Sequence, residues 1–184
     1  MPVDPSYPQE RILFMLEEAD AKTALTFGYE EKIITDTTAL ETFDYSKNTY
    51  SLENCNTPDD LCYLITTSGS TGKPKATMQT HFAVRNYADK NSKNIVFKNI
   101  LDKGQESIVS VTNFVFDIFV TESIVPVLHG LTVYFTNDDE AASQNKLALL
   151  IENNQIDIMQ TTPTKMRGYM LDKNNLDYLK KLKT

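Results

Sequence analysis

The chain has 184 residues, of which 41% are hydrophobic and 23% charged, and this composition is typical of a soluble globular protein. Its net charge of −7 argues against a nucleic-acid partner, because binding to phosphates requires a basic patch. The two cysteines and two histidines are too few and too widely spaced for a zinc site, and no apolar stretch resembles a membrane span or a signal peptide. We therefore expect a cytoplasmic chain that contains no metal site and binds neither membrane nor nucleic acid.

The first 60 residues predict the end of one α/β subdomain and an irregular connection. Pro8 can open a helix, and apolar residues follow it at helical spacing, which predicts a helix over 8–20. Short strands are predicted over 22–26 and 32–35. Residues 36–60 are polar and contain several asparagines and a proline, which favours a connection without regular structure.

From residue 61 onward, strands and helices are predicted to alternate. An apolar strand over 61–65 runs into a loop rich in serine, threonine and glycine, and an amphipathic helix follows over 80–97. Gly130 is placed to cap the helix that ends at residue 128. The remaining predicted strands are 107–111, 131–135 and 156–160, and the remaining helices are 117–128, 143–153 and 163–170. Alternation with short links predicts an α/β fold of parallel sheets with helices on both faces.

The loop after the strand over 61–65 has the chemistry of a phosphate-binding site. Residues 67–75 read Thr-Ser-Gly-Ser-Thr-Gly-Lys-Pro-Lys. Glycines let backbone N–H groups turn toward an anion, hydroxyls add donors, and lysine supplies positive charge. The spacing is not that of a Walker A loop, because two residues separate Gly69 from Gly72 and Pro74 follows Lys73. The alternative is a flexible surface turn of small residues.

This run resembles the phosphate-loop signature of the adenylate-forming superfamily, Thr-Ser-Gly-Ser/Thr-Thr-Gly-x-Pro-Lys-Gly. The superfamily includes acyl-CoA synthetases, luciferases and the adenylation domains of nonribosomal peptide synthetases. The chain departs from the signature at Ala76, where the family has glycine, and a requirement for positive φ there would strain the loop. The resemblance implies that the phosphates of ATP are bound by Thr67, Ser68, Gly69, Ser70, Thr71, Gly72 and Lys75.

Two further matches favour adenylation domains that activate amino acids. Residues 2–12, Pro-Val-Asp-Pro-Ser-Tyr-Pro-Gln-Glu-Arg-Ile, resemble the motif Pro-x-Asp-Pro-x-Tyr-Pro-x-Glu-Arg-Ile of peptide synthetases. Phe116 and Asp117 resemble the Phe-Asp pair whose aspartate binds the α-ammonium of the substrate. A carboxylate at the mouth of an apolar pocket selects for a cation, because an uncharged analogue leaves it unpaired. The alternative is that Asp117 only caps its helix.

The same resemblance places Ile118, Thr121 and Gln160 on the walls of the pocket that sets side-chain specificity. Thr121 lies one helical turn from Asp117, and Gln160 ends a predicted parallel strand. Their hydroxyl and amide groups favour a small or polar amino acid. The family has serine two residues after the aspartate, and Phe119 stands at that position here.

The resemblance therefore implies an internal fragment of the large N-terminal domain of an adenylation domain. Residues 1–60 would end its first α/β subdomain, and 61–184 would form the phosphate loop and part of the substrate-pocket subdomain. The full-length enzyme would use ATP and Mg²⁺ to make an aminoacyl-adenylate and then load the phosphopantetheine of a peptidyl carrier domain. The catalytic lysine would lie beyond residue 184, so we expect the fragment alone to be inactive. The alternatives are an acyl- or aryl-CoA ligase of the same superfamily and a non-catalytic module that binds a nucleotide or a partner.

Overall fold

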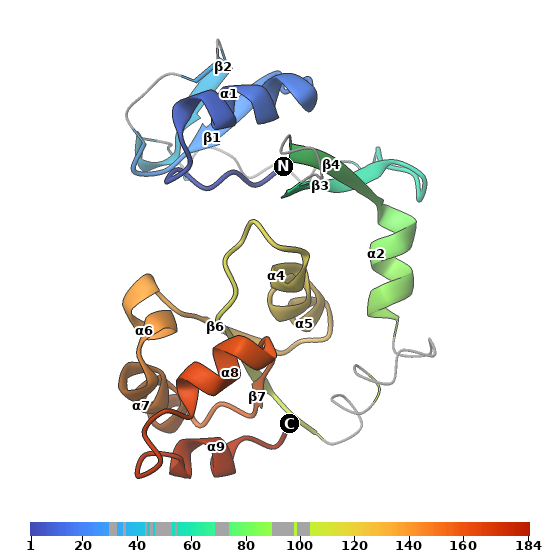
Figure 1. The fold of residues 1–184 in the computed structure, drawn as a ribbon. Helices are drawn as coiled ribbons and strands as arrows, with labels where there is room; N and C mark the ends of the chain where they lie inside the picture. The colour runs from blue at the N-terminus through green and yellow to red at the C-terminus, as the bar shows by residue number, and fades with distance from the viewer. Residues whose placement is uncertain are drawn as a thin grey trace. The chain divides into compact units, whose positions relative to one another are not determined.

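The computed structural model describes residues 1–29, 33–34, 36–42, 44, 46, 53, 55–68, 74–89, 98 and 104–184. The chain forms two compact units, Met1–Ala83 and Val84–Thr184, and Figure 1 shows the elements of each. No helix in these described ranges is long and apolar enough to cross a bilayer. The division into subdomains at residue 60 stays a prediction.

The first unit begins with α1 (Gln9–Glu18), β1 (Thr23–Thr26) and β2 (Asp36–Ala39). Helix α1 confirms the helix predicted over 8–20, and it buries Ile12 and Met15. Strand β2 runs parallel to β1, and a short 3₁₀ helix (Leu40–Thr42) follows it.

The strand predicted over 32–35 is wrong, and the prediction that residues 36–60 lack regular structure is wrong for 36–42. Residues 55–60 form no helix or strand, as predicted. Ile33 and Ile34 are described outside any strand, and pairing with β1 begins at Asp36. The Thr37 hydroxyl donates to the Ile34 carbonyl at 2.8 Å and fixes a turn there. The threonines of β2 then supply the β-branched residues that fit an extended strand. Lys32 and Thr35 lie outside the described residues.

A β-hairpin follows, formed by β3 (Leu61–Ser68) and β4 (Pro74–Thr80), which pair antiparallel. The strand predicted over 61–65 covers only the first five residues of β3, and β4 was not predicted. Thr66 and Thr67 are β-branched, and they continue β3 beyond its apolar residues toward the glycine-rich segment. Helix α2 (His81–Ala88) begins directly after β4, and residues 90–97 of the predicted helix lie outside the described residues.

The second unit contains a parallel sheet with the strand order β6-β5-β7. Its strands are β5 (Ser107–Ser110), β6 (Thr132–Phe135) and the short β7 (Ile158–Met159), and they confirm the three strands predicted in this part of the chain. The helices that follow β6 and β7 are α6 (Asp138–Ala142), α7 (Gln144–Asn154), α8 (Pro163–Tyr169) and α9 (Asp177–Lys181). Helices α7 and α8 were predicted; α6 and α9 were not.

Helices cover both faces of this sheet. On one face, Val109 of β5 packs with Leu147 and Ile151 of α7 and with Tyr178 of α9. Ile108 points to the opposite face, where α4 (Asp117–Glu122) contacts β5 and α5 (Ile124–Leu128) contacts β6. In Figure 1 the strands run between these two groups of helices. The predicted fold class, parallel sheets with helices on both faces, is confirmed.

One helix was predicted over 117–128, but the chain breaks it at Ser123 into α4 and α5. Pro126 explains the break, because its ring would collide with the carbonyl of Glu122 in a continuous helix and it has no N–H to donate. The predicted cap at Gly130 is confirmed. Gly130 has φ +78°, and Leu131 N–H donates to the Pro126 carbonyl at 3.0 Å, as in a Schellman motif.

Two buried tyrosines connect α8 and α9 to the core. The Tyr169 hydroxyl donates to the Ala141 carbonyl, and the Tyr178 hydroxyl donates to the Tyr169 carbonyl, each at 2.8 Å. Burial raises the pKa of Tyr169 to about 12, and the negative charges of Tyr178 and Glu122 add to the shift. The structure therefore favours the protonated form of this phenol.

We expect stability to fall as the pH rises above about 10, the usual tyrosine pKa, because the unfolded chain then releases a proton that the folded chain retains. Urea unfolding of the wild type between pH 9 and pH 11 is the measurement. A Tyr169→Phe variant should be less stable at neutral pH and should lose stability less steeply above pH 10. Equal slopes for the two proteins would contradict the assignment to Tyr169.

Candidate functional site

The ends of the predicted phosphate loop are held by the β3–β4 hairpin. Thr67 of β3 pairs with Lys75 of β4, and the Thr67 hydroxyl donates to the Lys75 carbonyl at 3.4 Å. Directly opposed residues of an antiparallel pair project from one face, so these two exposed side chains lie side by side. The neighbouring Thr66 contacts Met15 of α1, which places α1 on the other face. Gly69, Ser70, Thr71 and Gly72 lie outside the described residues, and of Ser68 only the backbone is described.

Ala76, where the family signature has glycine, lies within β4 and pairs with Thr66. Among the described residues other than glycine, only Asp20 and Gln155 have positive φ. Ala76 therefore adopts ordinary extended backbone, and the strain that the departure could have caused is absent.

We expect Ala76→Gly to lower the free energy of unfolding by about 0.5–1 kcal/mol, because glycine loses more backbone entropy on entering a strand. It should leave the KM for ATP unchanged, since no strain is relieved. Chemical denaturation and ATP kinetics on the same preparation measure both effects. A markedly lower KM for ATP would show that glycine is needed at this position.

The predicted substrate residues are distributed along α4 and after β7. Phe116 and Asp117 are exposed at the start of α4, Ile118 is half-buried, and Thr121 is buried. Gln160 is half-buried and directly follows β7. Because β5 and β7 are parallel neighbours, the segments that carry these residues leave the sheet at the same carboxyl edge. Ligand sites of parallel α/β sheets occur at this edge.

Asp117 is the first residue of α4 and not its cap. The N-cap is Phe116, which makes no side-chain capping bond, and the Asp117 carboxylate accepts a hydrogen bond from the N–H of Ile118 at 2.8 Å. Within the described ranges, no lysine, arginine or histidine forms an ion pair with it. The geometry thus presents an exposed carboxylate whose charge is not neutralised by a described residue.

Thr121 contacts a residue that the sequence did not single out. Its hydroxyl lies 3.3 Å from the Tyr87 hydroxyl near the end of α2. The end of α2 is fixed there by the Ala88 carbonyl, which lies 2.6 Å from Nε2 of His129, and by the packing of Ala88 on Val125. Sequence periodicity gave no reason to connect α2 with α4.

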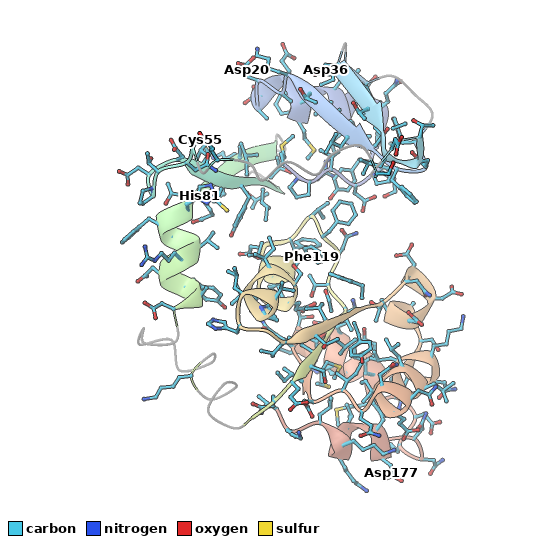
Figure 2. The ribbon with its side chains drawn as sticks, turned by 180° about the vertical axis from the view of Figure 1, so that it is seen from behind. Asp20, Asp36, Cys55, His81, Phe119 and Asp177 are labelled. Carbon is cyan, nitrogen blue, oxygen red and sulfur yellow. The ribbon has the colours of Figure 1, made fainter. Side chains whose placement is uncertain are left out.

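Phe119, where the family has serine, packs its ring against Phe135 of β6 with 5.8 Å between ring centroids. Figure 2 labels Phe119 on α4. The two rings line a pocket of about 470 Å³ at the carboxyl edge of the sheet, together with residues of the β5–α4 loop, α6 and α8. None of the five predicted substrate residues lines this pocket.

The carboxyl group with the most hydrogen bonds in this region is one that sequence reasoning missed. Glu122 of α4 is completely buried. Its Oε2 accepts hydrogen bonds from the N–H groups of Val111 and Thr112 at 2.9 and 3.0 Å and from the Ser110 hydroxyl at 3.2 Å. Its Oε1 accepts from the Thr112 hydroxyl at 2.7 Å. The available signal was a charged residue inside an otherwise apolar helical segment.

Lys165 of α8 completes this arrangement, because its ammonium group donates to the Val111 carbonyl. Burial lowers the pKa of the Lys165 ammonium below its usual value, and the charge of Glu122 opposes part of that shift. In the described ranges, no group of three histidine, cysteine or acidic side chains could hold a metal ion.

The β3–β4 hairpin and the parallel sheet with helices on both faces match the N-terminal part of the adenylate-forming fold. The nonribosomal peptide synthetase FmoA3, in its α-methyl-L-serine-AMP bound form, matches 98% of this chain and 20% of its own with a TM-score of 0.80 and 21% identity. The o-succinylbenzoate CoA synthetase of Bacillus subtilis matches 92% of this chain and 44% of its own with a TM-score of 0.72 and 19% identity.

The chain belongs to the AMP-binding enzyme family, which it matches over residues 1–184. It is 32% identical over 173 residues to tyrocidine synthase 3 and 34% identical over 169 residues to tyrocidine synthase 2, both of Brevibacillus parabrevis. It is also 31% identical over 179 residues to the N-(5-amino-5-carboxypentanoyl)-L-cysteinyl-D-valine synthase of Penicillium chrysogenum. These matches cover 89%, 89% and 92% of this chain but only 2%, 4% and 5% of the relatives' own lengths.

Proposed function

We propose that the protein that carries this chain activates an amino acid with ATP, producing an aminoacyl-adenylate and pyrophosphate. A carboxylate oxygen of the amino acid attacks the α-phosphorus of ATP, and the bond from that phosphorus to the bridging oxygen of the β-phosphate breaks. Pyrophosphate leaves with the electron pair of that bond. The phosphopantetheine thiol of a peptidyl carrier domain then attacks the acyl carbon of the adenylate. AMP leaves with the electron pair of the bond between that carbon and the phosphate oxygen, and the thiol proton is released.

The observation that carries this proposal is the exposed carboxylate of Asp117 at the carboxyl edge of the parallel sheet. An α-ammonium group would provide the positive charge that the described residues do not provide. Ile118, Thr121 and Gln160 would contact the side chain of the amino acid. The hydroxyl of Thr121 and the amide of Gln160 favour a small or polar substrate.

In the first unit, Lys75 and Thr67 are proposed to bind the β- and γ-phosphates together with the residues between them. A cation and hydroxyl donors at this point would stabilise the charge that builds on pyrophosphate as it leaves. Mg²⁺ would accompany the phosphates of ATP, and we assign none of the described residues as its ligand.

The test is pyrophosphate exchange by the full-length domain, meaning the protein that carries this chain together with the segments expected before and after it. We expect exchange that depends on one or a few amino acids and not on fatty or aryl acids. Exchange supported only by fatty or aryl acids would contradict the proposal and would indicate an acyl- or aryl-CoA ligase. Saturable ATP binding in calorimetry without exchange for any acid would identify a non-catalytic nucleotide-binding module.

A further inference from the structure

One residue of the second unit has both of its backbone polar groups bound by charged side chains from two helices. Val111, the first residue after β5, donates its N–H to the carboxylate of Glu122 on α4 at 2.9 Å. Its carbonyl accepts from the ammonium group of Lys165 on α8. We call Glu122, Val111 and Lys165 the carboxyl-edge clamp.

The clamp has little freedom to move. Burying a carboxylate completely costs free energy unless hydrogen bonds replace the water that it loses. Glu122 is completely buried, and two of the four hydrogen bonds that it accepts come from the consecutive backbone N–H groups of Val111 and Thr112. Sliding or rotating α4 would leave both the carboxylate and these N–H groups unpaired. The register of α4 against the end of β5 is therefore fixed.

The two sides of the clamp lie close in sequence to the proposed substrate residues. Glu122 is five residues after Asp117 on the same helix, and Lys165 is five residues after Gln160. Thr121, beside Glu122, is fixed by the same helix. The clamp thus connects the two chain segments that leave the carboxyl edge of the sheet and carry the predicted specificity residues.

We infer that Glu122 and Lys165 are positioning residues that set amino-acid affinity by fixing Asp117 and Gln160 relative to each other. The inference rests on the proposed function. Both residues act through Asp117 and Gln160, and neither contacts the substrate or takes part in the chemical step.

The test compares Lys165→Met and Glu122→Met with Glu122→Gln in the full-length domain. Methionine keeps the approximate side-chain volume and removes the polar end. Glutamine keeps an oxygen for the Val111 and Thr112 N–H groups and can donate to the Thr112 hydroxyl. We expect the methionine variants to raise the KM for the amino acid about tenfold or more, because each loses a charge-assisted hydrogen bond. The KM for ATP should stay within about twofold, and Glu122→Gln should resemble the wild type.

Lys180→Met is the matched control, because Lys180 is an exposed lysine of α9 that pairs with Asp177, three residues before it. If Glu122→Met does not fold, Lys165→Met carries the test, since Lys165 is only half-buried. A folded Lys165→Met variant with a lower Tm and an unchanged amino-acid KM would overturn the inference. Equal rises in the KM values of both substrates would also overturn it.

Amide hydrogen exchange separates failure of this inference from failure of the proposed function. The N–H groups of Val111 and Thr112 are bound by Glu122, so they should exchange faster in Glu122→Met than in the wild type, whether or not the wild type activates an amino acid. Faster exchange without amino-acid-dependent activity would support the clamp and refute the proposed function. Unchanged exchange would refute the clamp.

Discussion

Replacing Asp117 by asparagine is expected to lower kcat/KM for the amino acid by about 10²–10³-fold in the full-length domain. This loss corresponds to about 3–4 kcal/mol, the range for removing one partner of a desolvated ion pair. Asparagine has nearly the same shape but cannot neutralise the α-ammonium of a bound substrate. Pyrophosphate exchange over a series of amino-acid concentrations measures the effect, and the KM for ATP should change little.

Asp177→Asn provides the matched control, because Asp177 is also the exposed first residue of a short helix (Figure 2). If Asp117 acted only on the helix dipole, both substitutions would cost about 0.3–1 kcal/mol of stability and would leave exchange intact. The wild type should also reject the analogue that lacks the amino group, and Asp117→Asn should reject it much less. Equal discrimination by the two proteins would contradict the binding role of Asp117.

The parallel sheet was predictable because its signal is local. The apolar runs that became β5 and β6 are short, and helical patterns of adequate length separate them, so few topologies fit. Helix α7 is capped by Ser143, whose hydroxyl accepts from the Lys146 N–H. Gly130 likewise marked the end of its helix by its own conformational freedom.

The secondary-structure predictions fail where strand pairing or a steric clash, and not the local residue composition, decides the structure. β4 was missed because most of its residues are polar, and they form a strand because they pair with the antiparallel strand β3. The break at Ser123 follows from a clash between Pro126 and a carbonyl four residues earlier, although the apolar pattern continues across it. β2 was placed too early because isoleucines look more like a strand than the threonines that form it.

The residues of the candidate site likewise fall into two groups, those that the sequence could name and those that only the fold reveals. The residues named from the family motifs stay predictions, and the sequence could name them because those motifs are contiguous. Glu122 and Tyr87 could not, since their partners lie 10 or more residues away in sequence and are brought together only by folding. A buried carboxylate on α4 becomes meaningful only when the backbone N–H groups that it accepts from are known.

Lys75→Ala is expected to raise the KM for ATP about 10–100-fold, the effect of losing a charge-assisted hydrogen bond to phosphate. Lys75 is exposed on β4 beside Thr67, and no carboxylate of the described residues forms an ion pair with it. Its removal should therefore cost little stability. Exchange measured over a range of ATP–Mg²⁺ concentrations reports the change, and the KM for the amino acid should stay nearly constant.

Two controls decide between a phosphate loop and a surface turn. Lys75→Arg keeps the positive charge and should recover much of the affinity for ATP, although the guanidinium presents it in a different shape. Lys22→Ala removes another exposed lysine of the first unit, one that already pairs with Asp20, and should not change the KM for ATP. If Lys75→Ala and Lys22→Ala have the same KM for ATP, residues 67–75 form a turn without a role in ATP binding. Removing a positive charge next to bound phosphates would necessarily weaken their binding.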